Sequence, residues 1–417
     1  MRPQFHFTAR RGWINDPHGV TFRDGEYHVF YQYVPERTSW APNCHWGHAK
    51  GAVLLSLTEL PIAIAPGEGD DGIWTGSLVT DDDGRSRVFY TSTTQPDIGI
   101  GRVRVATPDG EDWIAWSKGA VVAEAPAELD IIAYRDPFVV REPDGWRMFL
   151  GAGLRDGTAT ALSYRSADLA GWEYEGIALQ RSTNEVDPVW MGALWECPQI
   201  IEVDGRWVMV SSVWDDDVLH YAGYAIGDYA DGVFTAESWG RLTYGPSYYA
   251  PSFFRDAAGR PCLTFWMRGV LDEDAGWASA HSVPHVLRIE DGRLVAAPHP
   301  DLDGHVGDAV ADGELPGLAG DIRWMPQPGD HCTVSLDGVA LVEVAAGDGM
   351  VAVAFDGDEW DVPAAGEVRL LLDGPVLELS SETGVFGLAL NATGRRFGTS
   401  GTGTLTVRDI AVKAFAG

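Results

Sequence analysis

Basic residues are scarce in this chain. It has 30 Lys and Arg against 61 Asp and Glu, which gives a net charge of −31 at pH 7. Proteins that bind nucleic acid need basic patches for the phosphates, so we expect no nucleic-acid partner. The same deficit disfavours anionic membrane surfaces, and the excess of acids indicates a well-solvated surface.

Long apolar runs and paired cysteines are also missing. No stretch of 18 apolar residues is present, and the sequence enters its first motif after a few residues without the apolar segment of a signal peptide. The four cysteines, scattered without close pairs, are Cys44, Cys197, Cys262 and Cys332. Reduced thiols in a cytosolic enzyme fit this pattern better than a disulfide framework, so we expect a cytoplasmic protein.

Signatures of cofactor and metal sites are absent as well. The sequence has no Walker loop, no His-Glu-x-x-His and no Gly-x-Ser-x-Gly. His45 and His48 have no evident third ligand, and we interpret the acidic runs 81–84 and 215–217 as solvated turns rather than calcium loops. We therefore predict neither a cofactor nor a metal.

A repeated pattern is what the sequence does contain. An anchor residue is followed nine positions later by a glycine, usually in an Asp-Gly turn, and then by an alternating apolar run. The five anchors are Asp16, Thr75, Asp136, Glu196 and Ala250, with spacings of 59, 61, 60 and 54 residues. Such a period indicates a repeat architecture, and Asp-Gly turns between alternating runs indicate β-hairpins. We predict an all-β fold whose first part is a five-bladed β-propeller.

The C-terminal part has a different pattern. Short alternating runs separated by turn signals occur at 333–336, 351–355, 368–372, 376–379 and 405–407. This spacing is typical of a β-sandwich. We predict a propeller over 1–295, a linker over 296–318 without clear periodicity, a smaller C-terminal β-sandwich over 319–417, and a flexible loop at 398–403.

Three of the five anchors are carboxylates: Asp16, Asp136 and Glu196. If the repeats superimpose, all three side chains point toward the central channel. Carboxylates crowded in this way cannot all ionise easily, so at least one pKa should rise. Cleavage of a glycosidic bond uses such a group, with one carboxylate at the anomeric carbon and one acid protonating the leaving oxygen.

Six motifs in order over residues 5–270 give a specific resemblance. They are Trp13-Ile14-Asn15-Asp16-Pro17-His18-Gly19, Phe30-Tyr31-Gln32, Trp46-Gly47-His48, Trp74-Thr75-Gly76-Ser77, Arg135-Asp136-Pro137 and Trp195-Glu196-Cys197-Pro198. This set resembles glycoside hydrolase family 32, the β-fructofuranosidases. The resemblance implies a five-bladed propeller followed by a β-sandwich. It also implies that Asp16 is the nucleophile, Glu196 the general acid/base and Asp136 the transition-state stabiliser.

The resemblance also implies a substrate pocket. Its expected residues are Asn15, Gln32, Trp40, Trp74, Thr75, Arg135, Tyr249 and Trp266. We expect a retaining hydrolase that releases terminal β-fructofuranosyl units from sucrose or short fructooligosaccharides. Retention predicts that the Asp16 and Glu196 carboxyl groups lie about 5–5.5 Å apart.

Alternatives remain open. One group of alternatives keeps the fold and changes the reaction: an exo-inulinase or levanase, a fructosyltransferase, or an arabinanase-like furanosidase. A different class is a non-catalytic carbohydrate-binding relative, against which the three retained acids argue. The partner in each case is a small carbohydrate.

Overall fold

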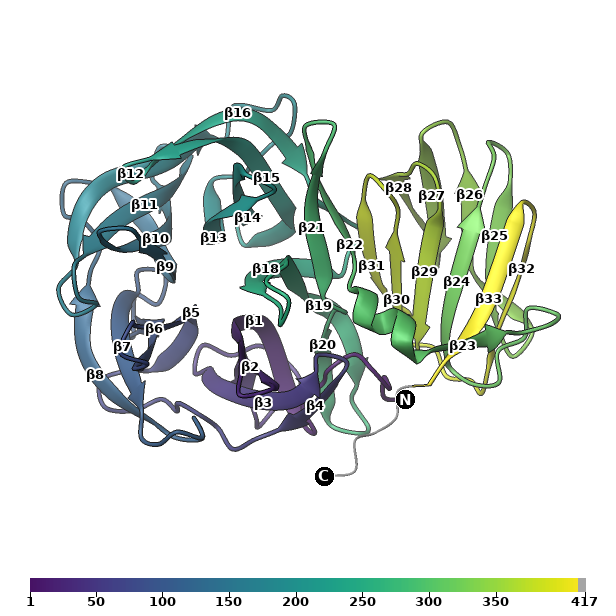
Figure 1. The fold of residues 1–417 in the computed structure, drawn as a ribbon, viewed down its shortest axis with the longest axis horizontal. Helices are drawn as coiled ribbons and strands as arrows, with labels where there is room; N and C mark the ends of the chain where they lie inside the picture. The colour runs from purple at the N-terminus through teal and green to yellow at the C-terminus, as the bar shows by residue number, and fades with distance from the viewer. Residues whose placement is uncertain (412–417) are drawn as a thin grey trace.

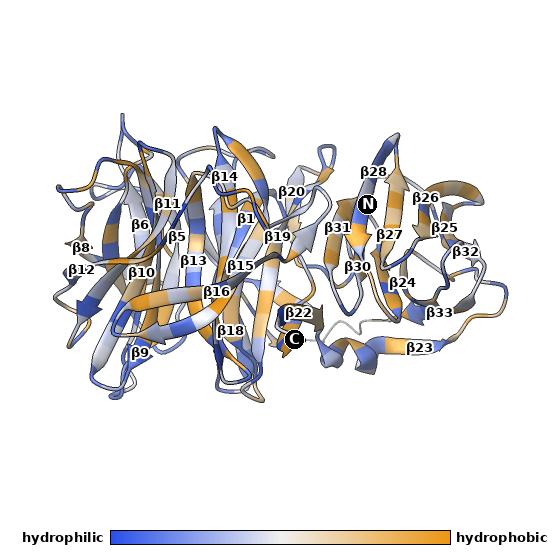
Figure 2. Cartoon of the chain, turned by 90° about the horizontal axis from the view of Figure 1, so that it is seen from above, coloured by the Kyte–Doolittle hydropathy of each residue, from blue (hydrophilic) through white to orange (hydrophobic). Residues whose placement is uncertain are grey.

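The computed structural model describes residues 1–411, and nearly all of its regular structure is β. A ring of sheets and a two-sheet sandwich lie side by side (Figures 1 and 2). The described residues include one short 3-10 helix, η1 (Pro300–His305), and no helix with the length and apolar character to cross a membrane.

Four-stranded antiparallel units make up the ring. Blade one is β1 (Gly12–Arg23), β2 (Glu26–Val34), β3 (His45–Val53) and β4 (Ser56–Glu59). Blade two is β5 (Gly72–Thr80), β6 (Ser86–Thr93), β7 (Arg102–Pro108) and β8 (Trp116–Ala123). Blade three is β9 (Ile131–Glu142), β10 (Gly145–Leu154), β11 (Thr158–Ser166) and β12 (Glu173–Ser182). Blade four is β13 (Leu194–Val203), β14 (Arg206–Asp215), β15 (Val218–Ala230) and β16 (Val233–Arg241).

The fifth blade closes the ring. It contains β18 (Tyr248–Arg255), β19 (Pro261–Asp272), β21 (His285–Glu290) and β22 (Arg293–Pro298). β20 (Trp277–His281) pairs with both β19 and β1, which joins blades five and one into one nine-stranded sheet. The inner strands β1, β5, β9, β13 and β18 each contact the next around the centre, and β18 contacts β1 (Figure 1). The predicted five-bladed propeller is confirmed.

Asp-Gly turns connect the first two strands of several blades, as the sequence predicts. Asp24 and Gly25 join β1 to β2 with φ angles of 52° and 85°. Asp204 and Gly205 join β13 to β14 with φ angles of 50° and 73°. Positive φ at both central positions matches the twist of a two-residue hairpin, and Asp and Gly tolerate it better than most residues. Each turn therefore fixes the pairing between the end of the inner strand and the start of the next strand.

The sandwich consists of two sheets around one apolar core. One sheet has the order β17 (Thr243–Tyr244), β31 (Val385–Ala389), β30 (Val376–Ser380), β29 (Val368–Asp373), β24 (Ala319–Met325), β33 (Thr404–Ile410), β23 (Val306–Ala309). The other has β28 (Asp358–Pro363), β27 (Met350–Phe355), β26 (Val339–Ala346), β25 (His331–Leu336), β32 (Phe397–Gly401). Trp324, Phe386 and Phe397 are fully buried between them. The predicted sandwich is confirmed.

Two details of this part differ from the sequence reading. The predicted flexible loop at 398–403 is wrong, because most of it is strand β32, paired along its length with β25. Its Gly, Thr and Ser content hid a strand whose alternate side chains are small. The predicted linker 296–318 contains η1 and β23, and β23 pairs with β33 of the sandwich. The division at 295 and 318 stays a prediction.

A buried ionic cluster joins the N-terminal segment to the sandwich. His6 Nδ1 lies 2.9 Å from Asp373 Oδ2, and His6 Nε2 lies 3.3 Å from Glu378 Oε1. Asp373 also accepts the backbone N–H groups of Gln4, Phe5 and His6. Burial works against a charged imidazole here, but the two carboxylates outweigh it and raise the pKa of His6 to about 9. The segment before β1 is therefore fastened by charge as well as by packing.

Candidate active site

The site is built where each inner strand carries a bulge. An extra residue interrupts pairing just after Arg135 on β9, Glu196 on β13 and Tyr249 on β18. Bulges bend a strand and redirect its side chains. The next residues, Asp136 and Cys197, have left-handed φ angles of 65° and 50°.

The register of these bulges corrects the alignment of the anchors. Glu196 is equivalent to Arg135 and Tyr249, and Cys197 is equivalent to Asp136. The expectation that Glu196 and Asp136 occupy the same repeat position is therefore wrong by one residue. The offset comes from the glycine, because Gly145 is the first residue of β10 and pairs with Glu142, whereas Gly205 lies within the turn before β14.

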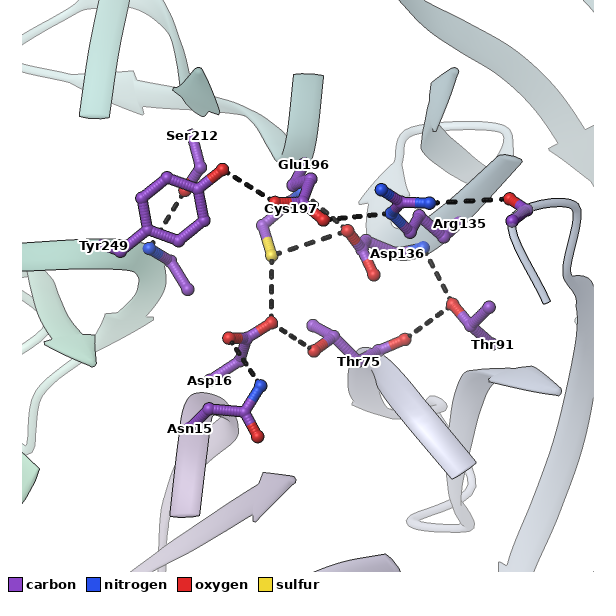
Figure 3. A network of polar contacts seen from close by, with 12 residues as sticks. Asn15, Asp16, Thr75, Thr91, Arg135, Asp136, Glu196, Cys197, Ser212 and Tyr249 are labelled. Atoms are coloured by element: carbon purple, nitrogen blue, oxygen red, sulfur yellow. Dashed lines mark hydrogen bonds and ion pairs between the residues drawn. The ribbon is translucent and has the colours of Figure 1, made fainter. Parts of the chain in front are cut away.

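Asp16 on β1 is held by three side chains. Thr75 Oγ1 donates to Asp16 Oδ2 at 2.7 Å, Gln32 Nε2 donates to the same oxygen at 3.1 Å, and Asn15 Nδ2 donates to Oδ1 at 3.1 Å. Gln32 also donates to Thr75 Oγ1 at 2.5 Å, which orients the hydroxyl. The Asp16 side chain is thus fixed from blades one and two (Figure 3).

Asp136 lies deeper, beside the cysteine that follows Glu196. The backbone N–H of Cys197 donates to Asp136 Oδ2 at 3.0 Å. Cys197 Sγ lies 3.7 Å from that oxygen and 3.8 Å from Asp16 Oδ2, so the thiol sits between the two aspartates (Figure 3). The backbone N–H of Asp136 donates to Thr91 Oγ1 at 2.8 Å.

Glu196 accepts hydrogen bonds from residues of both neighbouring blades. Arg135 Nε donates to Glu196 Oε1 at 3.0 Å, and Tyr249 Oη donates to Oε2 at 2.7 Å. Since these three residues occupy equivalent bulge positions, the propeller brings them together from blades three, four and five. The guanidinium carbon of Arg268 lies over the Tyr249 ring, 4.9 Å from its centroid and within the about 6 Å of a cation–π interaction. Both carboxylate oxygens of Glu196 therefore have a defined orientation.

Burial changes the acidity of two of the acids. Loss of water raises the pKa of Asp16 to about 6, with the hydrogen bond from Thr75 opposing the rise and the charge of Glu196 adding to it. Loss of water also raises the pKa of Asp136 to about 8; the charge of Glu196 adds to this rise, and Arg135 opposes it. The expectation that at least one pKa rises is met by both aspartates.

These groups open into one cavity of about 580 Å³. Its lining includes Asp16, Asp136 and Glu196, and seven of the eight expected pocket residues: Asn15, Gln32, Trp40, Trp74, Arg135, Tyr249 and Trp266. Thr75 is the exception, because it lies beneath Asp16 and lines the deeper channel instead. The structure brings together every residue that the sequence analysis selected.

The sequence analysis missed the rest of the lining. These residues are Trp13, Ile98, Gly99, Ile132, Ala133, Trp214, Asp217 and Leu219. Trp13 is the first residue of the first motif and could have been selected on that ground. Ile98, Ile132 and Asp217 come from connections between strands or their first residues, where no periodic pattern marks orientation. Asp217 belongs to the turn that we interpreted as merely solvated.

Two groups contain side chains of the types that bind metal ions. His45 and His48 lie three residues apart on β3, so they face opposite sides of the strand, and His48 Nε2 instead contacts His28 Nδ1 at 2.9 Å. Asp256, Cys262 and His299 have ligand atoms within 4.8 Å of one another. Asp256 Oδ2 already accepts from Arg260 Nε at 2.5 Å and lies 3.0 Å from His299 Nε2. The Asp256 carboxylate is therefore already paired with the guanidinium of Arg260.

Comparison with known proteins identifies the family. Residues 6–298 match the model of the glycosyl hydrolases family 32 N-terminal domain. A sucrose-6-phosphate hydrolase of Zymomonas mobilis is 33% identical over 72% of this chain and 62% of its own, and a Bacillus subtilis levanase is 31% identical over 72% and 47%. The chain thus spans less than two thirds of the length of these relatives.

A solved structure is similar over nearly the whole chain. The β-fructofuranosidase of Bombyx mori, in a mutant form bound to sucrose, superimposes with a TM-score of 0.85 at 26% identity, over 98% of this chain and 93% of that one. With a family model that matches most of its length, this chain belongs to glycoside hydrolase family 32.

Proposed function

We propose that this protein is a retaining β-fructofuranosidase that releases terminal fructosyl units from sucrose or short fructooligosaccharides. The observation that carries the proposal is the convergence of Asp16, Asp136 and Glu196 in one cavity, each fixed by hydrogen bonds from the neighbouring blades. The Bombyx mori relative is bound to sucrose, and the Zymomonas mobilis relative is named a sucrose-6-phosphate hydrolase.

Each acid has a distinct role in this mechanism. Asp16 attacks the anomeric carbon as a carboxylate, and its pKa of about 6 leaves most of it ionised at neutral pH. Glu196 gives a proton to the leaving oxygen and then takes one from the attacking water. Arg135 and Tyr249 hold the Glu196 carboxyl in place through both steps. Asp136, with its raised pKa, is placed to hydrogen-bond the ring hydroxyls of the fructosyl unit.

Unsatisfied polar atoms support sugar binding in this cavity. Asn15, Trp13 and Trp266 line the cavity, and each has a buried polar atom, Oδ1 of Asn15 and Nε1 of the two tryptophans, without a hydrogen-bond partner among the described residues. Buried polar groups are nearly always paired, so these atoms are fitted to the hydroxyls of a bound sugar. The rings of Trp13 and Trp266, which pack edge to face at 5.4 Å between centroids, supply an apolar wall beside them.

The four cysteines bear on where the enzyme works. Cys44, Cys197, Cys262 and Cys332 are buried and unpaired. Free thiols are typical of a reducing compartment, which supports action in the cytoplasm on short sugars that reach it. Cell fractionation with an activity assay tests this location.

An assay of sucrose hydrolysis tests the proposal. The unaltered protein should release equal amounts of glucose and fructose, while Asp16→Asn and Glu196→Gln should each lower kcat by at least about 10². Asp231→Asn is the matched control, because Asp231 is an exposed acid on the β15–β16 turn. Absence of any cleavage of sucrose, kestose, inulin or levan by the unaltered protein would refute the proposal. If large oligofructosides appear first from inulin, without free fructose, the enzyme cleaves within the polymer and not at its end.

A further inference from the structure

The leaving group must lie beside Glu196, because that residue protonates the leaving oxygen. The cavity walls include Trp214 and Leu219 from the same blade, Ile98 from the connection between β6 and β7, and Ile132 near the start of β9. Ile132 is 38% exposed at the mouth. Across the mouth stands Trp40, which is 44% exposed and packs edge-on against Trp74. Such walls suit the apolar faces of an uncharged sugar.

Positive charge is nearly absent from the same walls. Among the residues that line the cavity, all within the described chain, Arg135 is the single cation. Its guanidinium is engaged by Glu196 at 3.0 Å and lies 5.8 Å from the Trp74 ring centroid. A phosphate group bound here would have to draw Arg135 away from Glu196. That would leave the Glu196 carboxyl without one of its two orienting donors.

Negative charge stands at the rim instead. Asp217 lines the cavity from the turn between β14 and β15, Asp216 precedes it in that turn, and Asp215 is the last residue of β14. Asp217 is exposed and has a φ angle of 61°, so the turn holds it in a left-handed conformation at the start of β15. Like charges placed against one another disfavour recognition, and we expect a loss of about 100-fold in affinity, which corresponds to about 2.7 kcal/mol.

From these walls we infer that the leaving-group subsite takes an uncharged sugar and rejects a phosphorylated one, with Asp217 as a specificity-determining residue. The inference rests on the proposed function. It separates this chain from its relatives named sucrose-6-phosphate hydrolases, although those share about a third of its matched sequence. The sugars it selects are sucrose and neutral extensions of it.

Three substrates test the inference. Sucrose carries a free 6-hydroxyl on its glucosyl unit, sucrose 6-phosphate carries a dianion at that position, and raffinose carries a neutral galactosyl unit there. We expect kcat/KM for sucrose 6-phosphate to be about 100-fold below that for sucrose. We expect kcat/KM for raffinose to be clearly higher than that for sucrose 6-phosphate. Raising the salt concentration to about 0.5 M should narrow the gap between sucrose and sucrose 6-phosphate, since screening shortens the reach of Asp217.

A pair of matched variants tests the residue. Asp217→Asn removes the charge but keeps a side chain that tolerates positive φ, and it should raise the ratio of sucrose 6-phosphate to sucrose kcat/KM by about 5-fold. Asp231→Asn is the control, because Asp231 is also exposed, has a φ angle of 48° and lies past the opposite end of β15. Those ends are roughly 40 Å apart, well beyond electrostatic reach, so the ratio should not change.

The outcomes separate the inference from the proposed function. Cleavage of sucrose 6-phosphate as fast as sucrose, or faster, overturns the inference and leaves the fructofuranosidase proposal standing. Rejection of raffinose as strongly as sucrose 6-phosphate also overturns it, because the cause would then be size rather than charge. An unchanged ratio in Asp217→Asn overturns the assignment of Asp217. If none of the three substrates is cleaved, the proposed function fails and the inference fails with it.

Discussion

Thr75 offers a direct way to change the acidity of the proposed nucleophile. Its hydroxyl donates to Asp16 Oδ2 at 2.7 Å and opposes the burial that raises the pKa of Asp16 to about 6. Replacing Thr75 with valine keeps the shape of the side chain and removes the donor. The ionised form of Asp16 then loses stabilisation, so its pKa should rise further.

The size of the shift follows from hydrogen-bond energies. A bond to a charged group contributes about 1.5–3 kcal/mol, and one pKa unit corresponds to about 1.4 kcal/mol. Gln32 Nε2, 3.1 Å from the same oxygen, compensates for part of the loss. We therefore expect a rise of about one unit, from about 6 to about 7.

The acidic limb of kcat/KM for sucrose against pH reports this change, because it follows the ionisation of the free enzyme. With this shift, kcat/KM of the valine variant should be about eightfold below that of the unaltered protein near pH 5.5. Near pH 8 the shift should lower kcat/KM by less than about 1.2-fold. Any loss that is the same at both pH values adds to these factors. Thr75→Ser is the matched control, since serine keeps the hydroxyl and should leave the limb in place. A valine variant whose limb does not move, or whose loss is the same at every pH, would refute the account of Asp16.

Two further predictions follow from the site and from the ionic cluster. Glu196→Gln should lower activity on sucrose by about 10²–10⁴ and on an aryl fructoside by much less, because an aryl leaving group needs no proton; equal losses would remove Glu196 from the acid role. His6 has a folded-state pKa of about 9, raised above an unfolded value near 6.5, so its contribution to stability is complete below pH 6.5 and disappears as pH rises through 9. Chemical denaturation should show that the free energy of unfolding of the unaltered protein falls by about 3 kcal/mol over that range, and that this fall is absent in His6→Gln. The same dependence of the free energy of unfolding on pH in both proteins would contradict the role given to His6.

Much of the propeller could be predicted because its signals are local. Asp-Gly turns and alternating runs specify hairpins within a few residues, and a period near 60 residues specifies their repetition. The first motif also placed Asn15 and Asp16 on one strand, which is where β1 has them.

What escaped prediction depends on contacts between blades. Arg135, Glu196 and Tyr249 were expected in the site, but their direct hydrogen bonds arise because three bulges occupy equivalent positions, and a bulge is an extra residue in a ladder that a single strand does not reveal. Asp217 has its place because the β14–β15 turn overhangs the cavity, whereas its sequence resembles any acidic turn. In β32, small side chains concealed a strand that its neighbour β25 stabilises by pairing.

The stereochemistry of the product tests the central claim most directly. If Asp16 attacks the anomeric carbon, a covalent fructosyl–Asp16 intermediate forms, and a second attack restores the original configuration. Methanol added to a sucrose digest should capture that intermediate, and NMR of the early products should show methyl β-fructoside. Formation of the α-configured product instead would mean that water or methanol attacks directly, and that Asp16 is not the nucleophile.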